Sequence, residues 1–87
     1  MITAAQIRAA RGLLKWTQGT LAAKSGLSIV TLNMIESETV QARKSSLTAI
    51  QQALESGGVE FIGSGGGLGV RFRSEASGRI SIAQAGQ

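Results

Sequence analysis

The stretch QGTLAAKSGLSIVTLNMIES, residues 18–37, decides the fold of this chain. Gly26 separates two short runs of helical character and can take a positive φ without strain, so we expect a tight turn there. The small side chain of Ala22 lets the two helices approach each other closely. Leu32 and Ile35 lie three residues apart on one face of the second helix, and that face is expected to pack on a core. The opposite face then points outward, as in a helix-turn-helix.

A further helix is expected on the N-terminal side of this segment. Thr3 and Gln6 have the spacing of a capping box, in which each side chain accepts from the other residue's backbone N–H. Ile7, Ala10 and Leu14 follow at helical spacing and form one apolar stripe. The pattern therefore predicts a first helix that begins near Thr3.

Serine and threonine residues mark the other helix starts. Thr17 and Ser28 precede the two helices of the central segment, and Ser45 or Ser46 is expected to cap a fourth helix. We expect that helix to end at Gly57-Gly58. Its apolar stripe is formed by Leu47, Ile50 and Leu54.

The chain changes in texture after the fourth helix, because residues 57–87 hold nine of its twelve glycines. Residues 59–62 and 69–73 predict a β-hairpin closed by a flexible turn, and residues 78–82 are a candidate third strand. The turn lacks the Gly-Lys-Ser/Thr ending of a phosphate-binding loop. The predicted organisation is a helical domain at residues 1–58, a hairpin at 59–73, and a tail at 74–87 that is one short strand or disordered.

The composition excludes several functional classes. The 87 residues contain no Cys, His or Asp, which removes zinc fingers, disulfide scaffolds, thiol nucleophiles and the commonest general base. We therefore expect no enzyme activity, no cofactor and no metal. No apolar run approaches the roughly 18 residues of a membrane span, and no signal peptide is visible, so a cytoplasmic location is expected. The net charge of +4 lies entirely in residues 1–44, which favours a polyanionic partner there.

The central segment also resembles a known family. Residues 18–28, with Thr31-Leu32 and Ile35-Glu36 after them, are similar to the Cro/repressor type (XRE family) of helix-turn-helix transcriptional regulators. The resemblance covers roughly residues 4–62. It implies a mainly α, compact four-helix domain of the lambda-repressor type, here followed by the short β-hairpin. It also implies sequence-specific binding of double-stranded DNA, with a recognition helix at about Ser28–Ser37 in the major groove.

The resemblance assigns roles to individual positions. Arg11 and Glu36 match a structural ion pair that ties the first helix to the end of the third. The positions that would face base edges are Ser28, Ile29, Val30, Asn33 and Met34. The positions that would contact phosphates are Gln18, Thr31, Arg43 and Lys44.

The recognition helix departs from the usual polar or basic pattern of this family. Ile29, Val30 and Met34 are apolar, which suits contact with thymine methyl groups but also suits a protein surface. The alternative function is therefore a protein-interaction module, such as an antagonist of another regulator or an antitoxin-like partner.

One such helix reads only a few base pairs, so a homodimer on a two-half-site operator is expected. The hairpin, with Phe61 and Phe72, is the expected dimerisation element. Arg71 and Arg73 on its second strand have two open interpretations, namely protection of the strand edge and additional contact with DNA.

Overall fold

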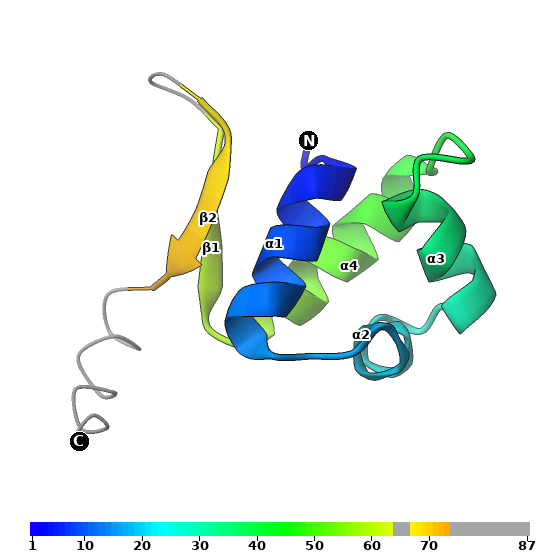
Figure 1. The fold of residues 1–87 in the computed structure, drawn as a ribbon, viewed down its shortest axis with the longest axis horizontal. Helices are drawn as coiled ribbons and strands as arrows, with labels where there is room; N and C mark the ends of the chain where they lie inside the picture. The colour runs from blue at the N-terminus through cyan, green and yellow to red at the C-terminus, as the bar shows by residue number, and fades with distance from the viewer. Residues whose placement is uncertain (64–66, 74–87) are drawn as a thin grey trace.

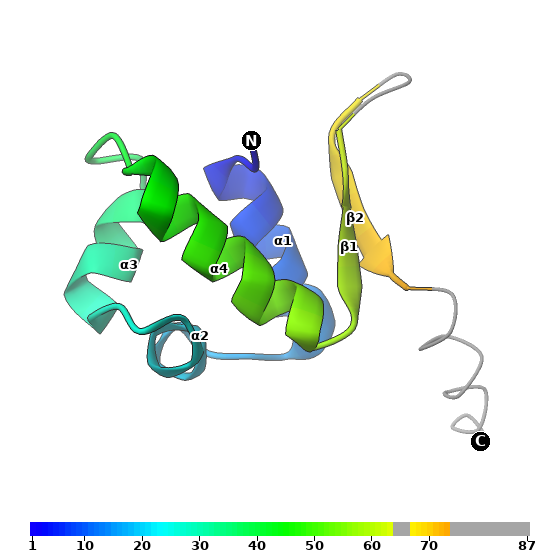
Figure 2. The same ribbon diagram turned by 180° about the vertical axis from the view of Figure 1, so that it is seen from behind.

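The computed structural model describes residues 1–63 and 67–73, in which four helices precede a two-stranded hairpin (Figure 1). The elements are α1 (Ala4–Leu14), α2 (Gln18–Ser25), α3 (Ile29–Glu36), α4 (Lys44–Ser56), β1 (Val59–Ile62) and β2 (Gly69–Phe72). Seen from behind, α4 crosses in front of α1, and the hairpin stands beside α1 (Figure 2). The mainly α fold with a C-terminal hairpin is confirmed. The candidate strand at residues 78–82 and the rest of the tail at 74–87 lie outside the described residues.

Local capping starts the first three helices as predicted. The Thr3 hydroxyl accepts from the Gln6 N–H at 3.1 Å, and the Gln6 side chain accepts from the Thr3 N–H at 2.9 Å. Thr17 and Ser28 each accept from the N–H three residues on, at 3.0 Å. Each of these side chains satisfies a backbone donor that has no partner inside its helix.

The predicted start of α4 is wrong. The helix begins at Lys44, its N-cap is Arg43, and no side chain caps it. The Leu47 N–H donates to the Arg43 carbonyl at 3.0 Å, so the first turn already encloses Ser45 and Ser46. Leu47 lies in the first turn of this helix and packs against the core.

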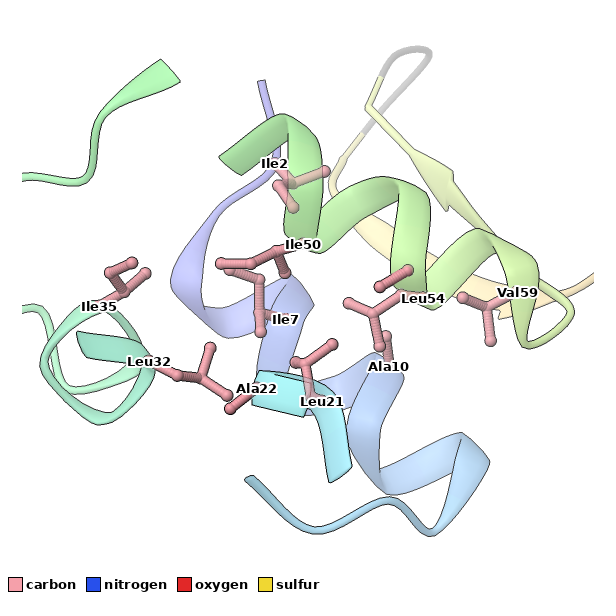
Figure 3. Packing of buried hydrophobic residues seen from close by; sticks show 11 residues of the cluster. Ile2, Ile7, Ala10, Leu21, Ala22, Leu32, Ile35, Ile50, Leu54 and Val59 are labelled. Atoms are coloured by element: carbon pink, nitrogen blue, oxygen red, sulfur yellow. The ribbon is translucent and has the colours of Figure 1, made fainter. Parts of the chain in front are cut away.

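A single aliphatic core holds the four helices and the hairpin together. Its buried residues are Ile2, Ile7, Ala10, Leu21, Ala22, Leu32, Ile35, Ile50, Ala53, Leu54 and Val59. Leu32 of α3 points toward Ala22 of α2, which shows why a small residue is needed where the two helices meet (Figure 3). Gly26 has φ 77°, as predicted for the turn between them.

The hairpin packs on α1 through one of its faces. Val59 lies opposite Phe72 and Phe61 lies opposite Val70, so these four side chains share that face. Val59 is fully buried, and Phe61 and Val70 pack against the core. The Gln6 amide nitrogen donates to the carbonyls of Ile62 and Gly69, both at 3.0 Å, and so connects α1 to both strands.

Candidate DNA-binding surface

The outward face of α3 carries most of the positions expected to read bases. Ile29 and Val30 are 51% and 63% exposed, and Asn33 is exposed one turn further along the same face. Ser28, at the N-cap, is also exposed, whereas Met34 is half-buried. Leu32 and Ile35 are buried beneath them, which fixes the orientation of α3. The helix therefore presents a mixed surface of two aliphatic side chains and two polar ones.

A buried ion pair attaches the end of α3 to α1. Arg11 donates from Nε to Glu36 Oε2 and from Nη2 to Glu36 Oε1, each at 2.8 Å. The Glu36 side chain is only 3% exposed. Hydrogen bonding to Glu36, together with its negative charge, raises the pKa of Arg11 despite the opposing effect of burial. The guanidinium also donates to the Trp16 carbonyl at 3.0 Å, so it anchors the α1–α2 connection as well.

Arg8 adds a second connection that the sequence analysis missed. Its guanidinium donates to the Glu36 carbonyl and lies 3.9 Å from the Glu38 carboxylate. Arg8 lies three residues before Arg11, which is one helical turn and thus the same face of α1. This spacing was the only feature of the sequence that pointed to a contact between Arg8 and the end of α3.

Gln18, expected at a phosphate, is held by two side chains of α3. Its Nε2 donates to Glu36 Oε1 at 3.2 Å, and its Oε1 accepts from Asn33 Nδ2 at 3.3 Å. An amide nitrogen carries two hydrogens, so a second N–H of Gln18 remains available for a phosphate. Through its hydrogen bonds to Glu36 and Asn33, Gln18 connects the start of α2 directly to α3.

Thr31 and Arg43 lie close together although they come from different helices. Both line one hollow of about 330 Å³, together with Ser46 and the connection between α3 and α4. The Thr31 hydroxyl accepts from Ser28 Oγ at 2.9 Å, while Arg43 and Lys44 are exposed at the uncapped start of α4. Backbone N–H groups at a helix start attract anions, so this end of α4 supplies donors besides the two basic side chains.

The sequence of this helical region matches a known family. A sequence model of helix-turn-helix domains matches residues 7–61, which is more than half of the 87 residues. The chain belongs to the XRE family of helix-turn-helix regulators. No curated protein matches the sequence. As a member of this family, the chain is therefore a DNA-binding helix-turn-helix regulator.

In this XRE-family chain the two phenylalanines of the hairpin differ in their surroundings. Phe61 packs against the protein's own core, so much of its ring is already covered within one chain. Phe72 is 36% exposed at the end of β2. Leu68, just before β2, is 61% exposed and was not singled out from the sequence, because it stands among the glycines of the predicted turn.

The described residues of this regulator show neither a membrane-spanning helix nor a cluster of metal-ligating side chains. None of its helices is long and apolar enough to span a membrane, as judged over residues 1–63 and 67–73. Within the same residues, no three His, Cys, Asp or Glu side chains gather as metal ligands would.

Proposed function

We propose that this protein is a sequence-specific transcriptional regulator that places α3, with its caps Ser28 and Ser37, in the major groove of double-stranded DNA. The observation that carries the proposal is the exposed outer face of α3 on a helix held rigidly from below. The buried Arg11–Glu36 pair and the core contacts of Leu32 prevent α3 from turning on its axis. A fixed helix can present side chains in a constant register to base edges.

The reading groups would be of two chemical kinds. Ser28 and Asn33 offer hydrogen bonds to base edges, and Asn is suited to adenine. Ile29 and Val30, with the half-buried Met34 beside them, offer apolar contact, which in the major groove favours the methyl group of thymine. We therefore expect an operator rich in A·T pairs.

Phosphate contacts would come from the residues that border the recognition face. Arg43, Lys44 and the shared hollow beside Thr31 lie at the start of α4. Gln18 contributes its remaining amide N–H at the start of α2. Such contacts set the position of the protein on DNA and carry no sequence information themselves.

The expected homodimer would form at the hairpin. In the described residues the sheet has two strands, so the outer edge of β2 meets no other strand. The Arg73 N–H donates to the Gly58 carbonyl at 2.8 Å, which directs the backbone groups of residue 73 toward β1. Backbone groups of alternate residues point to opposite edges, so those of Val70 and Phe72 point outward. An unpaired edge of this kind is a template for another strand.

Charge disfavours two of the possible registers for such a dimer. In a two-fold antiparallel pair centred on Val70, Arg71 lies opposite Gly69 of the second copy. Leu68 then lies opposite Phe72 of the second copy, which covers two apolar side chains that are 61% and 36% exposed. Centring the pair on Arg71 or Phe72 would place Arg71 opposite an arginine, and like charges directly opposite destabilise a sheet.

Sedimentation velocity without DNA tests this dimer. Leu68→Glu should make the protein monomeric at concentrations where the wild type is dimeric, because a carboxylate would enter the apolar contact. Val40→Glu is the matched control, since Val40 is 43% exposed and belongs to the connection between α3 and α4. Equal dimerisation of wild type and Leu68→Glu would contradict the hairpin interface.

A second candidate function rests on the exposed Ile29 and Val30. Two aliphatic side chains that together face solvent also suit a protein partner, such as another regulator or a toxin. A tight complex whose affinity hardly changes with salt, together with negligible DNA binding, would favour this alternative.

One titration separates the two functions. Fluorescence anisotropy compares binding to the upstream DNA of the protein's own gene with binding to a random duplex, at about 50 and 200 mM salt. A specific regulator prefers the upstream DNA and retains that preference at the higher salt. Equal binding to both duplexes that disappears at the higher salt would contradict sequence-specific regulation.

A further inference from the structure

Four polar side chains form a continuous line from the core to the recognition face. Arg11 donates to both carboxylate oxygens of Glu36 at 2.8 Å. Gln18 donates to Glu36 at 3.2 Å, and Asn33 donates to Gln18 at 3.3 Å. The line, which we name the amide relay, joins α1, α2 and α3 and ends at an exposed residue of the recognition face.

The amide relay has a fixed polarity. An ionised carboxylate only accepts hydrogen bonds, whereas an amide accepts at its oxygen and donates at its nitrogen. Glu36 therefore requires the nitrogen of Gln18, and this turns the Gln18 oxygen toward Asn33. That oxygen in turn requires the nitrogen of Asn33. The Asn33 oxygen is then directed away from Gln18.

The buried carboxylate of Glu36, where the amide relay starts, is stabilised as a charged hydrogen-bond acceptor by Arg11. Glu36 is almost fully buried and is paired at both oxygens with a guanidinium, a group that stays protonated at any pH at which proteins fold. Reversing either amide would place an oxygen against an oxygen, first at Glu36 and then at Gln18. The buried charge thus determines which end of Asn33 is free at the surface.

We propose that the amide relay makes Asn33 present its carbonyl oxygen to the major groove, so that it selects a base that carries an amino group on its major-groove edge. This inference rests on the proposed function, and it adds the kind of base that Asn33 recognises at one position of the operator. Adenine fits best, because its N6 amino group donates to the oxygen while its N7 accepts the second N–H of the Asn33 amide. Guanine and thymine present carbonyl oxygens at the corresponding place and leave the Asn33 oxygen without a donor.

Binding-site selection from a randomised duplex pool tests the inference with the full chain. Asn33→Ala identifies the base pair that Asn33 reads, because preference there should fall about fivefold or more. In the wild type that position should be adenine.

Gln18→Met keeps the side-chain length but removes both relay hydrogen bonds, so the Asn33 amide can reverse. We expect Gln18→Met to lower the preference for adenine at that position severalfold and to leave other base-pair preferences unchanged. Gln52→Met, an exposed glutamine of α4, is the matched control.

The outcomes distinguish failure of the inference from failure of the function. A G·C pair at the Asn33 position, or undiminished preference in Gln18→Met, would overturn the inference and leave sequence-specific binding intact. A wild type that selects no sequence would overturn the proposed function and the inference with it.

A measurement without DNA examines the relay itself. In ¹⁵N-labelled protein, the Asn33 side-chain amide signals should shift in Gln18→Met and not in Gln52→Met. Unchanged Asn33 signals would show that the relay does not form in solution, and would overturn the inference whatever DNA is bound.

Discussion

Breaking the Arg11–Glu36 pair should cost the fold a large part of its stability. Arg11→Met leaves a carboxylate that is 3% exposed without its two guanidinium hydrogen bonds. Removing one partner of a buried pair costs about 3–5 kcal/mol. Because the Arg11 side chain is itself 22% exposed and Gln18 still donates to Glu36, we expect a loss at the lower end, about 3 kcal/mol.

A loss of about 3 kcal/mol is a large part of the free energy of unfolding expected for a chain of this length. A chain of 87 residues has a free energy of unfolding of about 4–13 kcal/mol, at the usual 0.05–0.15 kcal/mol per residue. A loss of about 3 kcal/mol lowers the melting temperature by about 12–24 °C in a domain of this size. Urea unfolding followed by the fluorescence of Trp16, the single tryptophan, measures it, because Trp16 packs against the core.

The double variant Arg11→Met/Glu36→Leu identifies the mechanism. If the cost comes from an unpaired buried charge, replacing both residues by apolar ones should restore stability to within about 1 kcal/mol of the wild type. Arg71→Met is the matched control, because its pair with Glu60 at 3.3 Å is exposed and should contribute at most about 1 kcal/mol. The reasoning is refuted if Arg11→Met costs less than about 1 kcal/mol, or if the losses of the single variants simply add in the double variant.

Three further changes have defined outcomes. Gly57→Ala should destabilise the fold by about 1–3 kcal/mol in urea unfolding, because its Cβ would lie 2.8 Å from both the Leu14 and Trp16 side chains; an unchanged midpoint would mean that this contact relaxes freely. Lys15→Gly should raise stability by up to about 1 kcal/mol, because Lys15 has φ 57°, where a Cβ is strained; a lower melting temperature would contradict this. Lys44→Ala should weaken binding equally on all duplexes and reduce the slope of log affinity against log salt by about 0.9; an unchanged slope would exclude its phosphate contact.

Local sequence patterns determined most of the secondary structure. The caps at Thr3, Thr17 and Ser28 and the turn at Gly26 all follow from interactions between residues three or four apart. The geometry of a helix sets these spacings, so they can be read directly from the sequence. The start of α4 could not be read in this way, because no side chain caps it.

The sequence also separated the buried and exposed faces of α3. Leu32 and Ile35 at helical spacing predicted the inward face, and both are buried. The family resemblance placed Ile29, Val30, Asn33 and Met34 outward; the first three are exposed, whereas Met34 is half-buried. The periodicity of the helix alone predicted its inward face.

Apart from the capping contacts and the Arg11–Glu36 pair, only the tertiary structure decided what the polar side chains touch. Gln18 and Asn33 are fifteen residues apart, Arg8 and Glu36 twenty-eight, and Gln6 and Gly69 sixty-three. Gln6 was predicted as a capping residue, but nothing local indicated that its amide also holds both strands of the hairpin. Contacts at such separations depend on how whole helices pack, and the core that sets this packing is assembled from every element at once.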